Sequence, residues 1–598
     1  MAPGEALAAL GRLPAAASSK PAPGRTASSE PASSETDVVT RTAAAASGLL
    51  GAGTGGLLRA TALMAGGTLL SRVTGLARLL VAAYALGGNR LSDAFNLANN
   101  TPNIVHDLVL GGVLAATFVP QFVDRLARRR EAEALESISA VVTLSAAVLL
   151  TATALFVLAA PFVIDLYATG SSGPGLAGEK SVATDLLRLF AFQLLAYGAI
   201  SLMTALLNTV RRFVLAAYVP VLNNLVAIVV LLEFASAVSH RPSIAAVQHD
   251  RHLLLLLGIG TTAGVVLQAL ALVPATLRSG LRLRPTWRPF DPAVRELLSL
   301  SSWTFGFVVA NQLALFVVLA LAVHLGHASV TDYTYAFQFF QLPYGMIAVS
   351  VMSAFTPELA QRFSLGDAPG LARQFGIGLR RMLSGILPAT AGYLILAGPL
   401  IALLLRHGAF TTPDARLTGR LLALLAVGLP GYCTYLLCIR TLQAMRDTRT
   451  AFFLYLVENG LNIALAFALT PAIHTEGLSL SLSLAYSVAA LLALVVLRHK
   501  MGGLGGRRVV GRYVLRSASL SVLMALAVAA VTAALGSSSG LGLLVRVLAG
   551  LVVGVGVYGT GAALAGRSLA RERRGWQTAR TPRKAARRGT DGRHPSGH

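Results

Sequence analysis

The sequence predicts an all-α, polytopic membrane protein with fourteen transmembrane helices. Of its 598 residues, 55% are hydrophobic and only 13% are charged, whereas a soluble protein carries about 25% charged residues. A helix that spans the bilayer needs about 20 consecutive apolar residues, and the chain contains fourteen such stretches. They lie approximately at 61–86, 94–123, 138–167, 184–206, 214–237, 253–276, 300–325, 334–357, 382–405, 417–442, 451–471, 477–497, 514–535 and 541–566.

The loops between these stretches alternate in positive charge, which independently supports the number of spans. One set of alternate loops contains 22 lysines and arginines, and the other set contains six. Cytoplasmic loops carry the excess of positive charge, so the first set is predicted to be cytoplasmic. An even number of spans then places both termini in the cytoplasm. The net charge of +24 is explained by this topology, and we do not predict a nucleic-acid partner.

The chain also repeats itself at an interval of about 240 residues. AFNLANNTPN (94–103) resembles AFQFFQLPYG (336–345), and LLNTVRRF (206–213) resembles TLQAMRDT (441–448). Because the matches occur in the same order, we expect two pseudo-symmetric lobes of six helices each. Duplicated halves of a membrane protein usually enclose a substrate path, so a central cavity is predicted between the lobes. The last two spans are an addition to this core.

The chain therefore has six expected parts. The first is rich in Ala, Pro, Gly and Ser and cannot bury a core. The linker between the lobes is basic and broken by prolines, which is typical of a helix lying at the membrane interface or of an ordinary hydrated loop. The parts are 1–58, a disordered cytoplasmic tail; 59–276, the first lobe; 277–299, the interfacial linker; 300–498, the second lobe; 499–566, the two additional helices; and 567–598, a basic cytoplasmic tail drawn to anionic lipids.

The first span carries two arginines, Arg72 and Arg78, in its interior. Each arginine at the bilayer centre costs about 2.5–3.5 kcal/mol on the insertion scale, and no acid stands three or four residues from either one. The side chains could extend to an interface, or they could face a wet cavity that receives an anion. A guanidinium fork matches the oxygens of a pyrophosphate. The two positions are about 240° apart around a helix, so a shared ligand requires a bend at Gly75 or a wide cavity.

Several other polar residues lie within the apolar stretches. His106 and Asp107 are adjacent in the second span and could form a charge pair, a proton-sensitive gate or a water-facing lining. Gln312, Gln338 and Gln341 in the seventh and eighth spans could line the path or form hydrogen bonds between helices.

A possible cation site is predicted in the eleventh span at Glu458, Asn459 and Asn462. Glu458 and Asn462 are four residues apart and share one helix face, so their oxygens could hold a Na⁺ or accept a proton that couples transport to an ion gradient. The alternative is a polar contact between helices. The only cysteines, Cys433 and Cys438, lie in one apolar stretch, so neither a disulfide nor a metal site is expected. No catalytic motif and no bound cofactor are predicted.

At this point the motifs resemble a known family. SRVTGLAR (71–78), DAF (93–95) and PN (102–103) are similar to the opening signature of the MurJ (MviN) lipid II flippases. LLNTVRRFVLAAYVPVLNN (206–224) extends the similarity, which covers roughly residues 60–500. The wider superfamily also contains drug–cation antiporters and oligosaccharide-lipid flippases.

The resemblance implies a flippase that is not an enzyme. Such a protein moves lipid II, the undecaprenyl-pyrophosphate-linked peptidoglycan precursor, from the inner to the outer leaflet of the bacterial cytoplasmic membrane by alternating access. It would serve cell-wall synthesis, with cell-wall synthesis proteins as possible partners. The resemblance places Arg72 and Arg78 on the cavity arginines of the family and Asp93 on the acid that opens the second helix. Asn103, in the PN motif, joins the expected substrate-binding residues.

The sequence departs from the family at several positions. Many members carry a basic pair where this chain has His106 and Asp107, and an arginine where it has Gln338. An acid often follows the second arginine, where this chain has Leu79. The predicted cavity is therefore less cationic than in those members.

Three other functions are compatible with parts of the pattern. A cation-coupled exporter of drugs or of other lipid-linked oligosaccharides would share the architecture, although the paired arginines favour an anionic cargo. A membrane-embedded glycosyltransferase would need acids in a sizeable extracytoplasmic loop, and those loops are short. A scaffold for cell-wall assembly is the third alternative, and loss of export on depletion would argue against it.

Overall fold

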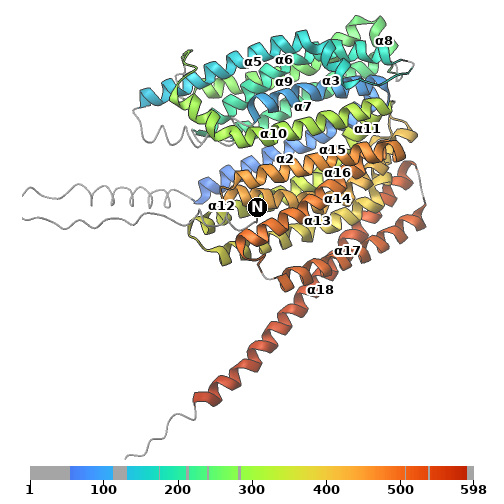
Figure 1. Ribbon diagram of the computed structural model, residues 1–598. Coiled ribbons are helices and arrows are strands. Elements are labelled where there is room, and N and C mark those ends of the chain that lie inside the picture. Colours follow the sequence, from blue (N-terminus) through green and yellow to red (C-terminus); the bar gives the residue numbers. More distant parts are fainter. Residues whose placement is uncertain are drawn as a thin grey trace, which may run out of the picture. The chain divides into compact units, whose positions relative to one another are not determined.

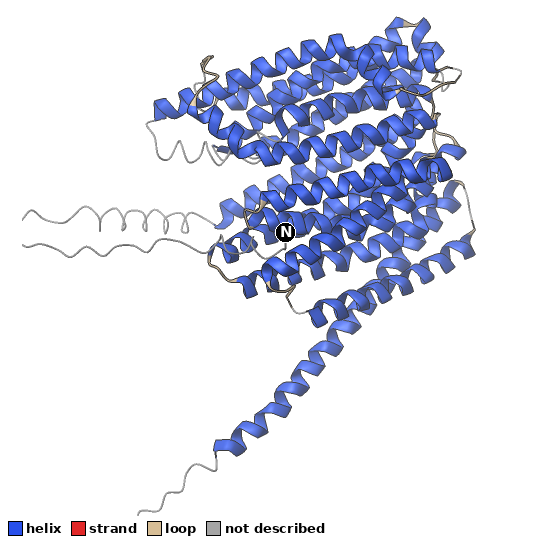
Figure 2. Ribbon diagram, viewed as in Figure 1, coloured by secondary structure: helices blue, strands red, loops and turns tan. Residues whose placement is uncertain are grey.

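The computed structural model describes residues 54–111, 131–173, 175–209, 214–238, 242–279, 284–326, 328–505, 507–536 and 539–588. The chain divides into two units, Met1–Leu63 and Met64–His598. All regular structure in the described residues is helical (Figure 2). The helices are α2 (Thr54–Leu86), α3 (Arg90–His106), α5 (Glu131–Tyr167), α6 (Leu176–Thr209), α7 (Val214–Ala237), α8 (Ile244–His249), α9 (Arg251–Leu277), α10 (Pro292–Leu325), α11 (Ser329–Pro343), α12 (Val349–Ser364), α13 (Ala368–Leu405), α14 (Thr412–Ala444), α15 (Thr448–Ile473), α16 (Thr475–Met501), α17 (Arg507–Leu535) and α18 (Gly540–Arg588), with π-helical turns η1 (Asp107–Gly111) and η3 (Tyr344–Ala348).

The described residues contain 13 helical segments that are long and apolar enough to cross a membrane. They follow thirteen of the predicted stretches in order, which confirms an all-α, polytopic membrane protein. The predicted second span, 94–123, is described only as far as Gly111, so the count of fourteen stays a prediction. The predicted tail 1–58 lies outside the described residues up to position 53. At the other end, α18 is helical through Arg588, well beyond the predicted stretch.

The helices of the first half pack into one group, here called the N-terminal group: α3, α5, α6, α7 and α9. Within it, α6 contacts α3, α5 and α9, and α7 contacts α9 (Figure 1). Phe95 of α3 and Phe190 of α6 meet edge to face with ring centroids 5.6 Å apart. By contrast, α2 packs less closely against the other described helices than these helices pack against each other.

The helices of the second half form the C-terminal group, α10 to α16, in which α14 is central. It contacts α13, α16 and α11, while α15 contacts α10 and α16. The α14–α16 contact is close because small residues face each other. A Cβ added at Gly428 would lie 2.4 Å from Cα of Ser483, and one at Gly431 would lie 2.8 Å from Cα of Ser487. The predicted additional helices α17 and α18 contact each other and α13.

We expect Gly428→Ala to destabilise the protein, because the added methyl group meets backbone that cannot rotate away. Overpacking of this kind costs about 1–3 kcal/mol. Thermal unfolding of the purified protein in detergent should therefore show a lower midpoint. Gly392→Ala in α13 is the matched control, since nothing lies within 4 Å of its added Cβ. An equal midpoint for Gly428→Ala and the wild type would contradict the close α14–α16 contact.

The internal repeat is visible as two π-helical turns. The segment 94–103 lies in α3 and is followed by η1, which ends at Gly111. Its counterpart, 336–345, runs directly into η3, which contains Gly345. π-helical turns are rare and occur frequently at functional sites. These irregular turns lie near Pro102 and Gly111 in one repeat and near Pro343 and Gly345 in the other, and prolines and glycines allow a helix to bend.

The linker between the two halves differs from its helical interpretation. Residues 284–288 are not helical. The backbone N–H of Thr286 donates to Oγ1 of Thr143 at 3.0 Å, and Arg288 pairs with Glu136 at 2.7 Å, so the linker is attached to α5. The prolines at 285 and 289 have no N–H to donate to a helix, which explains an extended segment. These five residues are therefore not part of an interfacial helix, and the position of the linker at the membrane interface stays a prediction.

Candidate functional site

A cavity of about 630 Å³ lies between α2 and helices from both groups. The walls come from α2, α3, α6, α7 and α11, so segments from both halves of the sequence contribute to it. No aspartate or glutamate is among its described lining residues, whereas two arginines are. Its polar lining residues are Thr68, Ser71, Arg72, Arg78, Asn103, Tyr197, Asn223, Asn224, Gln338 and Gln341.

Arg72 and Arg78 both line this cavity. The helix α2 runs without interruption across Gly75, so the width of the cavity, and not a break in the helix, brings both positions to it. Neither guanidinium makes a hydrogen bond or an ion pair with any residue that the structure describes. Arg72 lies beside Gly345 of η3, whose added Cβ would be 3.6 Å from the Cζ atom. The two charges therefore face open space between the two helix groups.

The contact that holds α2 against the N-terminal group was not foreseen from the sequence. Nδ2 of Asn224 in α7 donates to the carbonyl oxygen of Ser71 at 3.2 Å and to Oγ1 of Thr74 at 3.0 Å. The amide thus positions the turn of α2 that carries Arg72. The internal repeat contains a signal: Asn224 follows LLNTVRRF (206–213) as Asn459, a predicted cation ligand, follows TLQAMRDT (441–448).

We expect Asn224→Ala to loosen α2 by removing both of these hydrogen bonds, each worth about 0.5–1.5 kcal/mol. Amide hydrogen exchange in α2 around Ser71 and Thr74 should become several-fold faster. Asn223→Ala is the matched control, because this neighbouring side chain lines the cavity but makes no hydrogen bond to a described residue of α2. Equal exchange in α2 for the two variants would contradict the assigned role of Asn224.

Of the eight predicted substrate-binding residues, the structure brings five to the cavity: Arg72, Arg78, Asn103, Gln338 and Gln341. The other three, Asp93, His106 and Asp107, are not among its lining residues.

His106 and Asp107 contact each other and neighbouring helices. Nδ1 of His106 lies 3.2 Å from Oδ1 of Asp107, and its Nε2 lies 3.2 Å from Oγ of Ser201 in α6. Gln312 of α10 donates to Oδ2 of Asp107 at 2.9 Å. The two side chains are therefore close enough to form the predicted charge pair. Asp107 also connects the N-terminal group to α10.

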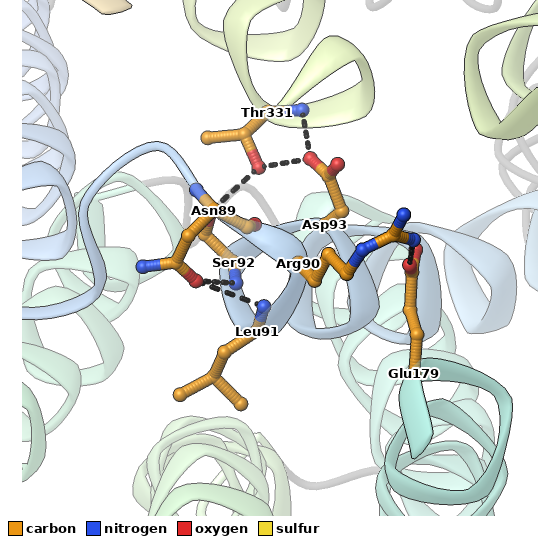
Figure 3. A network of polar contacts seen from close by, with 7 residues as sticks. All are labelled: Asn89, Arg90, Leu91, Ser92, Asp93, Glu179 and Thr331. Atoms are coloured by element: carbon orange, nitrogen blue, oxygen red, sulfur yellow. Dashed lines mark hydrogen bonds and ion pairs between the residues drawn. The ribbon is translucent and has the colours of Figure 1, made fainter. Parts of the chain in front are cut away.

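Asp93 lies in a separate polar network between α3 and α11 (Figure 3). Its Oδ1 accepts from the backbone N–H of Thr331 at 2.9 Å and from Oγ1 of Thr331 at 2.7 Å. The residue before α11, Ala328, has φ of 63° and provides no side-chain cap. The first backbone N–H groups of a helix have no acceptor within that helix. The carboxyl of Asp93, on a helix of the N-terminal group, accepts the hydrogen bond from one of these N–H groups in α11. Asn96 adds a bond to Oγ1 of Thr331 at 3.2 Å.

A second contact joins the two groups beside this network. The turn between α2 and α3 packs on the segment before α14, where the N–H of Ala409 donates to the carbonyl oxygen of Tyr84 at 2.9 Å. The backbone approach is close, since a Cβ added at Gly87 would lie 2.5 Å from the carbonyl oxygen of Ala409. Together with the Asp93–Thr331 network we call this contact the seal.

The seal lies at one end of the helices. It lies where α2 ends and where α3 and α11 begin, which is the end joined by the weakly charged set of loops. The cavity lies toward the other end, because Ala216 and Ala217 near the start of α7 line it. That other end carries the arginine-rich loops. The structure thus has one cationic cavity on the basic side of an inter-group contact.

The predicted cation residues are buried in the C-terminal group, away from this cavity. Nδ2 of Asn459 donates to Oε2 of Glu458 at 2.8 Å, and Oδ1 of Asn462 accepts from Ser481 of α16 at 3.1 Å. Tyr435 of α14 and Tyr455 of α15 stack edge to face nearby, with centroids 5.6 Å apart. Whether these residues bind an ion stays a prediction.

A helical membrane protein with many apolar spans and a cavity between two groups of helices defines a class, the polytopic membrane transporters. The particular family follows from sequence comparison. The profile of the family described as lipid II flippase MurJ matches residues 82–552. The chain belongs to this family.

Individual relatives support the assignment. The chain is 27% identical over 447 residues to the probable lipid II flippase MurJ of Rhizobium meliloti (strain 1021), covering 74% of this chain and 80% of the relative. It is 26% identical over 449 residues to the lipid II flippase MurJ of Burkholderia cenocepacia, covering 74% of this chain and 84% of the relative.

Solved structures share the fold. A lipid II flippase MurJ in an inward closed conformation superposes with a TM-score of 0.69 at 21% identity, covering 85% of this chain and 99% of the other. An inward-facing multidrug resistance transporter of the MATE family and MOP superfamily gives a TM-score of 0.58 at 14% identity, covering 72% and 94%. At these identities the likeness concerns the fold alone.

Proposed function

We propose that this chain is a flippase for lipid II, the undecaprenyl-pyrophosphate-linked peptidoglycan precursor, in the bacterial cytoplasmic membrane. One observation carries the proposal: Arg72 and Arg78 line a single cavity without an acid in its described lining. An arginine in a membrane protein is costly unless water, a partner or a ligand compensates it. A pyrophosphate offers two or more charge-assisted hydrogen bonds to each guanidinium.

The asymmetry between the two ends suggests the direction of transport. Because the arginine-rich loops are expected in the cytoplasm, the cavity lies on the cytoplasmic side and the seal on the extracytoplasmic side. In this state the headgroup of the precursor would enter from the inner leaflet. Opening of the seal and closure of the other end would then expose it to the outer leaflet, which is alternating access.

Other polar residues would complete the headgroup site. Asn103, Gln338 and Gln341 are positioned to bond to the sugar and peptide parts, because amides can both donate and accept. Gln338 stands where many family members carry an arginine, so this cavity would rely more heavily on Arg72 and Arg78.

The alternative, a cation-coupled drug exporter, is less well supported. A cationic drug would need an acid in the cavity, and the described lining residues include none. Coupling to Na⁺ or H⁺ through Glu458 is a separate proposal. It is tested by measuring flux in proteoliposomes while the Na⁺ gradient, the pH gradient and the membrane potential are imposed one at a time. Flux that depends on none of these three gradients would overturn the proposal of ion coupling.

Depletion of the protein in its native bacterium tests the function. Intact cells or spheroplasts are treated with an impermeant hydrolase that cleaves the precursor only in the outer leaflet. We expect the protected, inner-leaflet fraction of the precursor to rise on depletion and to fall again on re-expression. An unchanged leaflet distribution would contradict a flippase and favour a scaffold.

A further inference from the structure

A second pocket, separate from the cavity, lies in the N-terminal group between α6, α8 and α9. Its volume is about 470 Å³, and it shares no lining residue with the cavity. The pocket lies near the start of α6 and α9, at the same end of the helices as the seal. Its lining residues are Ser181, Val182, Asp185, Arg188, Leu189, Val247, Gln248, Arg251, Leu254 and Leu255.

The polar side of this pocket carries a net positive charge. Arg188 and Arg251 line it together with one acid, Asp185. Asp185 lies 3.4 Å from Arg188, a weak contact between two side chains that are 45% and 48% exposed. Arg251 has no ion pair with any residue in the described part of the chain. One guanidinium is therefore unmatched, and the hydroxyl of Ser181 and the amide of Gln248 add further donors.

The pocket lining also includes apolar residues. Leu189, Leu254 and Leu255 lie along the membrane-spanning parts of α6 and α9. Arg188 itself is 12 residues after the start of α6, about 18 Å along the helix axis at 1.5 Å per residue. It therefore lies within the span and not in a loop. An arginine at this depth is stabilised when its head reaches a phosphate at the membrane interface.

We propose that this pocket binds the headgroup of an anionic membrane phospholipid, with the phosphate at Arg188 and Arg251 and the upper acyl chain along the three leucines. Arginine binds phosphate through paired, charge-assisted hydrogen bonds. A soluble phosphate would satisfy the arginines but would leave the leucine wall without a partner. With the predicted topology, the lipid belongs to the outer leaflet. The site is therefore independent of the cargo cavity and of the proposed transport.

Native mass spectrometry of the delipidated full-length protein in detergent tests this proposal. The probes are phosphatidylglycerol, diacylglycerol of the same acyl chains and inorganic phosphate. The wild type should retain phosphatidylglycerol at least about ten-fold better than diacylglycerol. The double variant Arg188→Gln/Arg251→Gln should lose most of that preference. Arg416→Gln, an exposed arginine at the same end of the molecule, should retain it.

The outcomes separate the alternatives. Retention of phosphatidylglycerol by the double variant at the wild-type level would overturn the proposal. So would displacement of the lipid by millimolar inorganic phosphate, which would indicate a site for a soluble anion. Thermal unfolding of each variant identifies one that has lost its fold. If the double variant has lost its fold, single variants replace it. Arg188→Lys and Arg251→Lys keep the charge and should lose less of the preference for phosphatidylglycerol than Arg188→Gln and Arg251→Gln. Equal binding of phosphatidylglycerol by the Lys and Gln variants would also overturn the proposal.

Discussion

Replacement of both Arg72 and Arg78 by alanine is expected to abolish export of the precursor while the protein remains in the membrane. Each arginine is unpaired within the described residues and faces the same cavity. Hydrogen bonds to charged groups are worth about 1.5–3 kcal/mol each, which corresponds to a loss of about ten-fold to a hundred-fold per arginine. The double variant should therefore fail to support growth when the native copy is depleted.

Graded variants give this prediction its controls. Lysine at either position keeps the charge but loses the planar fork, so Arg72→Lys and Arg78→Lys should retain part of the activity. Arg416→Ala removes an exposed arginine outside the cavity and should export normally. Normal export by the double alanine variant at wild-type abundance would refute the assigned role of the cavity.

Replacement of Asp93 by alanine is expected to open the seal. The side chain is 3% exposed and bonds to both the backbone and the hydroxyl of Thr331, so its loss leaves buried donors without an acceptor. Such donors cost about 1–3 kcal/mol, enough to shift a two-state equilibrium by about five-fold to a hundred-fold. Spin labels at exposed Ser172 and His407, one on each side of the seal, should report a larger population of long distances.

Two variants control this experiment. Asp93→Asn keeps an acceptor oxygen and should produce a smaller shift than alanine. Asp165→Ala removes an exposed acid at the same end of the helices that pairs with Lys180 within the N-terminal group, and it should leave the distances unchanged. The native cysteines are buried and should not compete for the label. Distances in Asp93→Ala that match the wild type would show that the seal depends on other contacts.

Much of the fold could be predicted because hydropathy is a local property of the chain. Each apolar stretch must satisfy its backbone hydrogen bonds within its own helix, so its position can be read without knowing its neighbours. The two arginines could be selected for the same reason, since their cost in hydrocarbon is evident from the first span alone. Residues 284–288 of the linker are not helical, since the prolines at 285 and 289 have no N–H to donate to a helix.

The remainder of the site depends on contacts that local patterns do not contain. Tyr197 and Asn224 line the cavity because of how α6 and α7 are oriented. The repeat relates Asn224 to Asn459, but nothing in its own span indicates that it contacts α2. Asp93 was expected to bind substrate, but its partner Thr331 is 238 positions away in the sequence. Its role in the seal becomes visible only when α3 and α11 are placed together. A substrate role for Asp93, His106 and Asp107 would require a different conformation.

The central claim is that the two cavity arginines recognise the diphosphate of the cargo. Binding of lipid II to the purified protein tests it most directly, compared with an analogue that has the same lipid and sugar-peptide but a neutral linker. The wild type should prefer lipid II by at least about a hundred-fold, from two charge-assisted hydrogen bonds at the lower end of their range. Arg72→Ala/Arg78→Ala should bind the two compounds equally. Equal binding by the wild type, or an unchanged preference in the double variant, would contradict the account.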